Sequence, residues 1–225
     1  MSNIGFRIRP DFQRPDRRLI EAFEGLPVAN IADCMNRISC IAPPIRPFNK
    51  AKLLGCALTV RSTGGDNLLF HKALDLAKPG DVIVVADGGT DRRSCCGEIM
   101  VQYAISKGLA GFVVDACIRD SDAIAELDFP VYARGVTPNG PYKNGPGEIN
   151  FPVSLCGIVI CPGDILIGDG DGVAVVKPED AGELAAVTRK VFEKETKFLE
   201  DIAAGRGLNR SWVDRMLTEK GCELV

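Results

Sequence analysis

The sequence has 225 residues, of which 46% are hydrophobic and 25% are charged, a composition typical of a globular protein long enough to bury a core. Its formal net charge of −3 argues against a nucleic-acid-binding surface, and no apolar run approaches the roughly 18 residues that span a bilayer. Because the charged N-terminus lacks the apolar segment of a secretory leader, we expect a cytoplasmic protein with no membrane or nucleic-acid partner.

Hydrophobic periodicity predicts helices and strands that alternate along the chain, followed by a run of strands and a helical end. No shift in composition marks a linker. We therefore expect one α/β domain over residues 25–190, with a helical N-terminal arm at 1–24 and a helical tail at 191–225. The predicted helices are 16–24, 27–37, 66–77, 97–108, 179–204 and 209–220, and the predicted strands are 55–62, 81–86, 111–117, 129–134, 148–154, 156–161, 164–168 and 172–177.

Two segments share a Pro-Gly-Asp turn followed by an apolar run, GDVIVVADGG and GDILIGDGDG. We interpret the likeness as shared turn chemistry rather than as an internal repeat. The GDGDG at 168–172 has the wrong spacing for a nucleotide-binding glycine loop, and it lacks the sixth-position glycine and twelfth-position glutamate of a calcium loop. It predicts a hairpin turn.

Cysteine and histidine usage limits the possible chemistry. The nine cysteines are odd in number, include no CxxC pair and lie mostly in apolar runs, so we expect reduced, buried side chains. Cys95 and Cys96 are expected in a loop beside the candidate site, in a structural role. His71 is the single histidine, which argues against a zinc site built on several histidines. A catalytic triad would have to use His71, which we interpret instead as a residue of the predicted helix 66–77.

The segment that begins with strand 81–86 and continues through helix 97–108 and strand 111–117 predicts a β-α-β unit. If the two strands are parallel, the crossover is right-handed, and the start of the helix lies at the same rim as the ends of both strands. Open α/β sheets commonly bind ligands at this rim. Three polar stretches are expected to converge there: Asp87-Gly88-Gly89, Gly97-Glu98 and Arg119-Asp120.

These residue types favour an anionic ligand and a hard cation. Unpaired amides at the helix start, from Gly97, Glu98, Ile99 and Met100, attract a carboxylate or a phosphate. The planar fork of Arg119 suits the same groups, and Asp120 can hold Mg²⁺ or Mn²⁺. Glu98 is positioned to order a water or to move a proton. Spacing alone equally fits a surface turn with a first-turn glutamate.

The stretch GDNLLFHKALDLAKPGDVIVVADGG, followed by Gly97-Glu98, twenty residues and Arg119-Asp120, resembles the 4-hydroxy-4-methyl-2-oxoglutarate/4-carboxy-4-hydroxy-2-oxoadipate aldolase family, which is related to the regulator of ribonuclease activity A. The similarity covers residues 25–190. It implies an αββα sandwich, a homotrimer or a dimer of trimers, and a divalent metal at a site between subunits. It continues through FPVYARGVTPNG, INFPVSLCGIVICPGD and GDGDGVAVV.

The resemblance also implies an activity and a division of roles. Asp120 would hold Mg²⁺ or Mn²⁺, while the backbone of 97–100 and Arg119 would hold a pyruvate-type ligand. The expected reaction is metal-dependent cleavage of 4-hydroxy-4-methyl-2-oxoglutarate or 4-carboxy-4-hydroxy-2-oxoadipate to pyruvate and a second oxo acid, with oxaloacetate decarboxylation as a side activity. Arg119, Asp120 and Glu98 are the expected catalytic residues.

Three other functions are weighed against this one. A Schiff-base aldolase needs a reactive lysine, and Lys72, Lys143 and Lys177 are all expected to lie outside the rim. A methyltransferase would need a glycine-rich nucleotide loop, which the sequence lacks. A non-catalytic protein that binds a ribonuclease would belong to the regulator branch. Members of that branch are shorter, so the N-terminal arm and the helical tail of this chain favour the enzyme. The apolar side chains in both arms, together with the resemblance, predict a terminal helix that reaches a neighbouring subunit.

Overall fold

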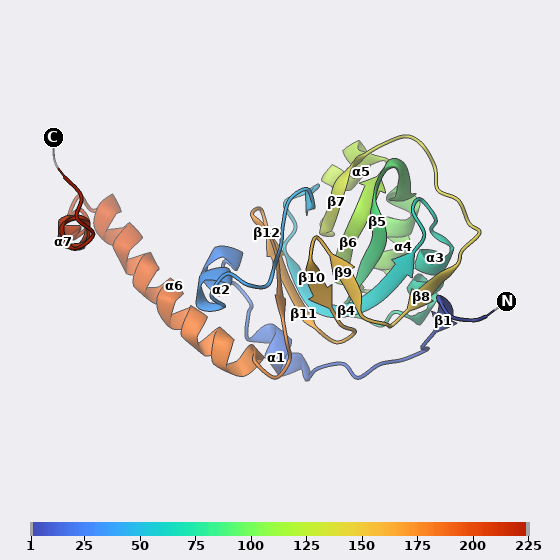
Figure 1. Ribbon diagram of the computed structural model, residues 1–225, viewed down its shortest axis with the longest axis horizontal. Coiled ribbons are helices and arrows are strands. Elements are labelled where there is room, and N and C mark those ends of the chain that lie inside the picture. Colours follow the sequence, from blue (N-terminus) through green and yellow to red (C-terminus); the bar gives the residue numbers. More distant parts are fainter. Residues whose placement is uncertain (1, 224–225) are drawn as a thin grey trace. The chain divides into compact units, whose positions relative to one another are not determined.

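The computed structural model describes residues 2–223 and shows a mixed α/β fold (Figure 1). The helices are α1 (Arg17–Glu21), α2 (Val28–Cys34), α3 (Leu68–Leu76), α4 (Glu98–Ser106), α5 (Ser121–Ala125), α6 (Ala181–Ala203) and α7 (Ser211–Glu219). The strands are β1 (Phe6–Ile8), β2 (Cys40–Ile41), β3 (Arg46–Pro47), β4 (Leu53–Ser62), β5 (Asp81–Cys96), β6 (Gly111–Ile118), β7 (Val131–Val136), β8 (Gly147–Ile149), β9 (Val153–Leu155), β10 (Ile158–Ile160), β11 (Ile165–Asp169) and β12 (Gly172–Val176).

Within the described residues, ten strands form one sheet whose main path is β2-β12-β11-β4-β5-β6-β7-β3. Strands β4, β5, β6 and β7 are parallel neighbours, while β11 and β12 run antiparallel. The β5-α4-β6 segment is therefore the predicted β-α-β unit. The predicted hairpin turn is also confirmed, because Asp169 pairs with Gly172 across a two-residue connection.

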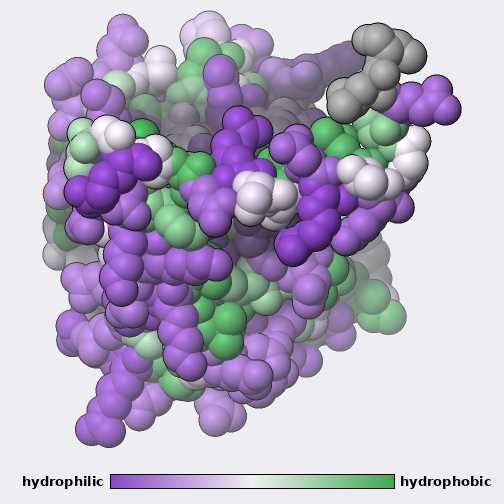
Figure 2. All heavy atoms as spheres, turned by 90° about the vertical axis from the view of Figure 1, so that its left-hand side faces the viewer, coloured by the Kyte–Doolittle hydropathy of each residue, from purple (hydrophilic) through white to green (hydrophobic). Residues whose placement is uncertain are grey.

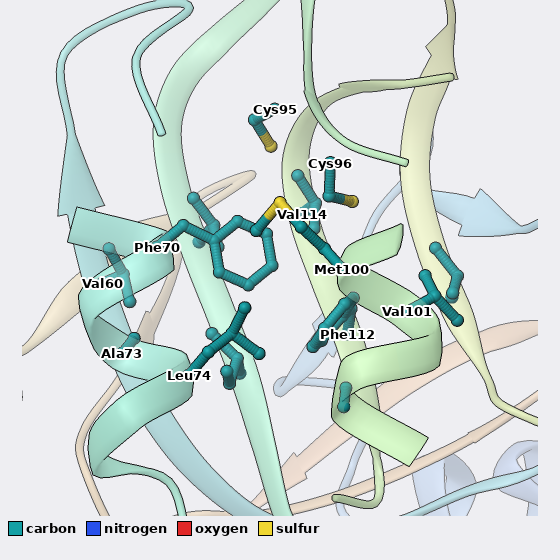
Figure 3. Close-up of a cluster of buried hydrophobic side chains, with 14 of the residues drawn as sticks. Val60, Phe70, Ala73, Leu74, Cys95, Cys96, Met100, Val101, Phe112 and Val114 are labelled. Carbon is teal, nitrogen blue, oxygen red and sulfur yellow. The ribbon is translucent and has the colours of Figure 1, made fainter. Parts of the chain in front are cut away.

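Helices cover the sheet on both outer sides, which confirms the αββα sandwich. On one side α3, α4 and α5 pack on β4–β7, and Phe112 meets Phe70 edge-on with ring centroids 4.9 Å apart (Figure 3). On the inner side a second core lies between β4–β7 and the strands β9–β12. Side chains alternate along a strand, so Leu166 belongs to this inner core while its neighbours Ile165 and Ile167 do not. Helix α2 contacts β11 and β12.

Two predicted boundaries differ from the structure. Strand β5 does not end at residue 86 but continues to Cys96, with register shifts against β6 after Val85. The segment after residue 86 looked like a loop because it is polar and glycine-rich. The predicted strand 148–154 is divided into β8 and β9, because Asn150 adopts a positive φ of 61° that a regular strand does not accommodate.

The N-terminal arm contains the predicted helix α1, but its first part differs from the expected helical arm. Residues 6–8 form β1, which pairs in parallel with β8. Arg7 anchors the strand by donating to the buried Glu148 carboxylate at 2.8 Å, and its guanidinium lies 4.6 Å from the centre of the Phe151 ring. Sheet pairing and this buried partner outweigh the local sequence, so the arm is part of the domain.

The two Pro-Gly-Asp turns share one arrangement. Asp81 accepts the amide of Lys78 and Asp164 accepts the amide of Cys161, each at 2.8 Å and three residues back. Each carboxylate also meets a cation, because Arg14 binds Asp81 and Lys177 binds Asp164. Since the recurring feature is a turn closed by a buried aspartate, the interpretation as shared turn chemistry is confirmed.

The chain divides into two compact units, residues 1–188 and residues 189–225. The second unit holds the remainder of α6 and the helix α7, and it exposes Phe198, Leu199 and Trp212. None of the helices among residues 2–223 has both the length and the apolar character needed to cross a membrane. Figure 2 shows one face of the molecule on which hydrophilic side chains predominate and hydrophobic ones form separate groups.

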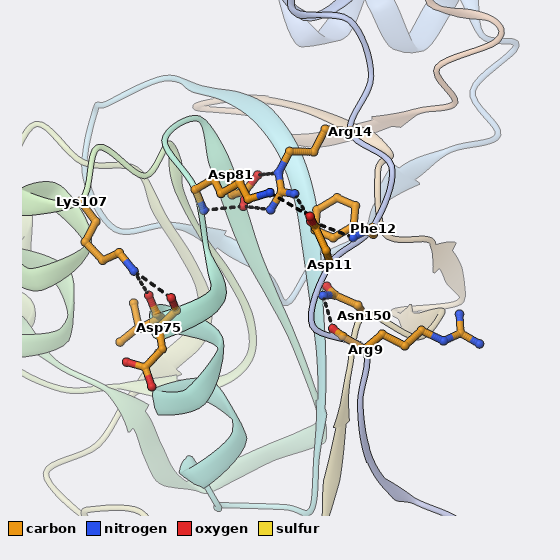
Figure 4. A network of polar contacts seen from close by, with 10 residues as sticks. Arg9, Asp11, Phe12, Arg14, Asp75, Asp81, Lys107 and Asn150 are labelled. Carbon is orange, nitrogen blue, oxygen red and sulfur yellow. Dashed lines mark hydrogen bonds and ion pairs between the residues drawn. The ribbon is translucent and has the colours of Figure 1, made fainter.

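A buried ion pair fixes the segment before α1 to the sheet (Figure 4). The Asp81 side chain is 1% exposed, and it accepts hydrogen bonds from Arg14 Nε at 2.8 Å and Nη2 at 2.6 Å. Arg14 also bonds Asp11, whose pKa is lowered by hydrogen bonds from Lys78, from the backbone and from Arg14. The bidentate geometry compensates both groups for their loss of water.

We expect Asp81→Ala to lower the free energy of unfolding by about 3–5 kcal/mol, because the substitution leaves the Arg14 guanidinium and the Lys78 amide without their buried acceptor. Urea denaturation measures the change. The matched control is Asp75→Ala, which removes an exposed partner of Lys72 and should change stability by less than about 1 kcal/mol. Equal effects of the two substitutions would contradict the anchoring role of Asp81.

Candidate functional site

A cavity of about 400 Å³ lies at the rim predicted from the β-α-β unit. Its walls come from the start of α3, the end of β5, the start of α4, the residues after β6, and the connection between β7 and β8. The size suits a small organic ligand. The lining residues are Asn67, His71, Ser94, Cys96, Gly97, Ile99, Met100, Arg119, Asp120, Gly140, Pro141 and Lys143.

The structure brings the start of α4 against the residues that follow β6. The Glu98 amide donates to Asp120 Oδ2 at 3.1 Å, and the Arg119 amide donates to the Cys96 carbonyl at 3.0 Å. A Cβ atom at Gly97 would overlap Asp120 Oδ2 and stand 2.9 Å from Arg119 Cγ. Asp120 has a φ of 58°, a left-handed conformation that costs a non-glycine residue energy and tends to occur at functional sites. The expected convergence of these four residues is therefore present.

The amides at the start of α4 divide into two pairs. Those of Glu98 and Met100 are engaged, because Asp120 accepts the first and the Gly97 carbonyl accepts the second at 3.1 Å. Those of Gly97 and Ile99 have no hydrogen-bond acceptor among the described residues. The expectation of four unpaired amides is thus reduced to two, because the Asp120 carboxylate caps the helix. Both of these residues line the cavity.

Arg119 and Asp120 combine a charge of each sign at the cavity. Arg119 Nε lies 3.7 Å from Asp120 Oδ2, and both side chains are nearly half exposed. The separation exceeds hydrogen-bond distance, so the guanidinium keeps its donors for an anionic ligand. Glu98 is half-buried beside them, but its side chain is not part of the cavity wall. The structure therefore places Arg119 and Asp120, but not Glu98, in the wall of the cavity.

The expected metal fits this donor set. The described residues contain no group of three or more His, Cys, Asp or Glu side chains gathered for a metal. Asp120 presents one carboxylate at the cavity, and the missing Cβ of Gly97 leaves it room beside the helix. Mg²⁺ usually takes one or two protein carboxylates and completes its octahedron with water and substrate oxygens. Asp120 is accordingly the residue that would hold Mg²⁺ or Mn²⁺.

The cavity wall contains two residues that the sequence analysis does not assign to the site. Lys143 was expected outside the rim but lines the cavity, and His71 faces it from α3. Burial lowers the pKa of His71, and the charge of Lys143 lowers it further. A signal for Lys143 did exist, because β7 runs parallel to β6 and its following loop must start at the same rim. The predicted helical position of His71 is correct.

The structure of residues 87–96 differs from the prediction at two points. Asp87 is buried and accepts hydrogen bonds from the Ser62 hydroxyl and from the Gly65 amide, the latter at 2.8 Å, so it is not part of the cavity wall. Cys95 and Cys96 lie in β5 rather than in a loop, and both are buried (Figure 3). The extension of β5 past residue 86 explains both changes. All nine cysteines are unpaired, and Cys222 alone is exposed.

Comparisons with known proteins agree on one family. The family model described as RraA-like, Aldolase/RraA, matches residues 28–175. A protein of Halalkalibacterium halodurans named "Putative 4-hydroxy-4-methyl-2-oxoglutarate aldolase" is 38% identical over 180 residues, which cover 79% of this chain and 86% of that protein. The solved structure of an uncharacterized Pseudomonas syringae protein has a TM-score of 0.77 and 26% identity, with 86% of this chain and 96% of that chain covered.

A second solved structure carries a different name. Streptomyces coelicolor RraAS2, described as an unusual member of the RNase ES inhibitor RraA protein family, has a TM-score of 0.72 and 28% identity. The match covers 84% of this chain and all of that chain. The relatives thus carry both enzyme names and inhibitor names.

The buried carboxyl group of Asp87 should make stability depend on pH. Burial raises its pKa to about 6, against the hydrogen bonds from Ser62 and Gly65, with Asp115 and Asp66 nearby. Because this pKa exceeds the unfolded value of about 3.9, the stabilising contribution is present below pH 4 and is lost as the pH rises through 6.

We therefore expect Asp87→Asn to gain stability relative to the wild type between pH 4 and about 6.5, by on the order of 1–2 kcal/mol. Guanidinium denaturation of both proteins across this range measures the difference. Parallel pH profiles for the two proteins would contradict the assignment.

Proposed function

Because the chain belongs to the RraA-like family, Aldolase/RraA, we propose that it is a divalent-metal-dependent aldolase. Its substrate would be a 4-hydroxy-2-oxo acid, either 4-hydroxy-4-methyl-2-oxoglutarate or 4-carboxy-4-hydroxy-2-oxoadipate, and its products pyruvate and a second oxo acid. The observation that carries the proposal is the convergence of Arg119, Asp120 and the amide end of α4 on one small cavity.

The chain's own groups can hold the pyruvate half of the substrate. The amides of Gly97 and Ile99 point from the positive end of α4, where a carboxylate is favoured. Arg119 adds a planar pair of donors beside them. Together they would fix the 2-oxo acid end, so that its reacting C3–C4 bond lies within the cavity.

Catalysis requires a place for the electrons released when that bond breaks. The C4 hydroxyl loses its proton as the C4 carbonyl forms, the C3–C4 electron pair moves into the enolate of pyruvate, and C3 then accepts a proton to become the methyl group. Arg119 provides preorganised positive charge for the enolate oxygen. A divalent ion at Asp120 would supply Lewis acidity at the 2-oxo group.

Proton transfer is assigned to water held by nearby carboxylates. Glu98 is our candidate for ordering that water, since it lies at the start of α4 beside Asp120. The enolate described above is also produced when oxaloacetate loses CO₂, so we infer decarboxylation as a side activity. A cytoplasmic location and an assembly as a homotrimer or a dimer of trimers complete the proposal.

The alternative is a non-catalytic protein that binds a ribonuclease. The inhibitor name of the Streptomyces relative favours it. The cavity favours the enzyme, because a protein that acts by surface contact gains nothing from a strained Asp120 next to an arginine fork that lies beyond hydrogen-bond distance of it.

Pyruvate release from 4-hydroxy-2-oxo acids and from oxaloacetate tests the proposal directly. We expect activity to vanish in EDTA and to return with Mg²⁺ or Mn²⁺, because Asp120 offers a hard oxygen ligand. Full turnover in EDTA, together with borohydride trapping of a lysine–pyruvate adduct, would instead indicate a Schiff-base aldolase. Lys143 would then be the lysine already in the cavity.

Substitutions of the two neighbouring residues should separate their roles. We expect Arg119→Lys to lower kcat by about 10²–10³, because a point charge does not replace the planar fork. We expect Asp120→Ala to raise the Mg²⁺ concentration needed for half-maximal activity. Unfolding midpoints serve as the control for both variants. Wild-type rates and metal dependence in both would show that the site is wrongly placed.

A further inference from the structure

Cys95 and Cys96, at the end of β5, lie on the same face of the sheet although they are consecutive residues. Side chains normally alternate along a strand, which would send the two thiols to opposite faces. Cys96 pairs with Ile118 of β6, however, and Ser94 pairs with the residue before Ile118. Two steps along β5 thus correspond to one step along β6, so Cys95 is the extra residue of a β-bulge. Both cysteines consequently belong to the core beneath α3 and α4 (Figure 3).

The two thiols contact each other but differ in their access to solvent. The Cys95 thiol makes a hydrogen bond with the Cys96 side chain, and this bond, together with burial, raises the pKa of Cys95 well above its ordinary value. Cys95 is fully buried, whereas Cys96 lines the cavity of the candidate site. A small solute that enters the cavity therefore meets Cys96 first, and a protonated thiol lies next to it.

The backbone of the same two cysteines holds parts of the candidate site. The Cys95 carbonyl accepts a hydrogen bond from Asn67 Nδ2 at 2.9 Å, and Asn67 also lines the cavity. The Cys96 carbonyl accepts the Arg119 amide at 3.0 Å. Any change in the conformation of the peptide between the two cysteines therefore disturbs contacts of the cavity wall.

We propose that Cys95 and Cys96 are an oxidation site for hydrogen peroxide, where a reversible disulfide forms and breaks the contacts that hold Arg119 and Asn67. The Cys96 sulfur attacks one peroxide oxygen, the O–O bond breaks, and a sulfenic acid and one water result. The Cys95 sulfur then displaces the sulfenic hydroxyl, which leaves with the Cys95 proton as a second water. The two thiols together lose two electrons and two protons, and the peroxide is reduced to water.

The ring formed in this way is strained, which favours its reversal. Consecutive Cα atoms are about 3.8 Å apart across a trans peptide bond, below the range of about 4.4–6.8 Å that disulfides usually span. The peptide between Cys95 and Cys96 must therefore leave its present conformation, and its strain is relieved when the bond is reduced. Strained disulfides are the labile ones, as a reversible modification requires.

Mass spectrometry of the peroxide-treated protein tests this chemistry. Free thiols are alkylated after treatment, and trypsin then cuts after Arg93 and Lys107, which leaves both cysteines on one peptide. We expect this peptide to escape alkylation, to be lighter than the dithiol form by two hydrogen atoms, and to return to the dithiol form in dithiothreitol. Oxidation of Met100 on the same peptide is distinguished by the added mass of an oxygen atom. Complete alkylation of both thiols, or a disulfide to any other cysteine, would overturn the proposal.

Single substitutions test the order of the two steps. In Cys95→Ala the second thiol is missing, so Cys96 should remain a sulfenic acid that dimedone labels. In Cys96→Ala the thiol at the cavity is missing, so Cys95 should stay unlabelled. Cys56→Ala is the matched control, because Cys56 is equally buried but pairs with Asp81 at the opposite end of β5, and it should leave the disulfide yield unchanged. Equal labelling of Cys95 and Cys96 in the two variants would contradict the order.

Hydrogen exchange tests the effect on the site without any measurement of catalysis. In the wild type, peroxide should speed exchange of the Arg119 amide by about 10-fold, as the loss of about one hydrogen bond predicts, and dithiothreitol should restore the original rate. Cys96→Ala should show the same Arg119 exchange rate before and after peroxide. Unchanged exchange in wild-type protein that carries the disulfide would overturn the link between the cysteines and the site, whether or not the chain cleaves a 4-hydroxy-2-oxo acid.

Discussion

The close approach of Gly97 to Asp120 is the constraint on which the candidate site depends. Any side chain at residue 97 would overlap the Asp120 carboxylate and crowd Arg119. The backbone of Asp120 is left-handed, and the hydrogen bond that its carboxylate accepts from the Glu98 amide offsets that strain. The first turn of α4 and the end of β6 are thereby joined through one carboxylate, which is also the only acidic side chain in the cavity wall among the described residues.

The sheet makes this contact possible by letting β5 run far beyond its apolar part. Register shifts against β6 after Val85 carry the strand to Cys96, which lies opposite Ile118. After one intervening residue, Gly97, the helix starts directly beside the residues that follow β6. Asp87, at the start of this extension, is buried at the cost of a raised pKa and is stabilised by Ser62 and Gly65. A strand that ended at residue 86 would place ten flexible residues between the sheet and the site.

Much of this arrangement could be predicted from the sequence, for identifiable reasons. Continuous apolar runs at β5 and β6 around an intervening helix indicate parallel strands, and parallel strands bring Glu98, Arg119 and Asp120 to one rim. The extension of β5 could not be predicted, because DGGTDRRSCC has the composition of a loop and becomes extended only beside β6. The position of Lys143 was missed because two signals had to be combined. The parallel order of β6 and β7 indicates the rim, but the loop is held there by Asp66, which is distant in the sequence.

Under the proposed function, the charges around the cavity also explain why a metal ion and an anionic ligand should each strengthen the binding of the other. Without a metal ion, the negative charge of Asp120 repels an approaching anion. It also partly neutralises the positive charge of Arg119, which lies 3.7 Å away. A divalent ion at Asp120 reverses the sign of that local charge, so Arg119 and Lys143 then act on an anionic ligand without opposition. Since coupling between two ligands is reciprocal, a bound carboxylate must strengthen the metal site by the same factor. On the proposed function, a single carboxylate ligand would therefore suffice, because the substrate would supply the remainder of the binding energy for the ion.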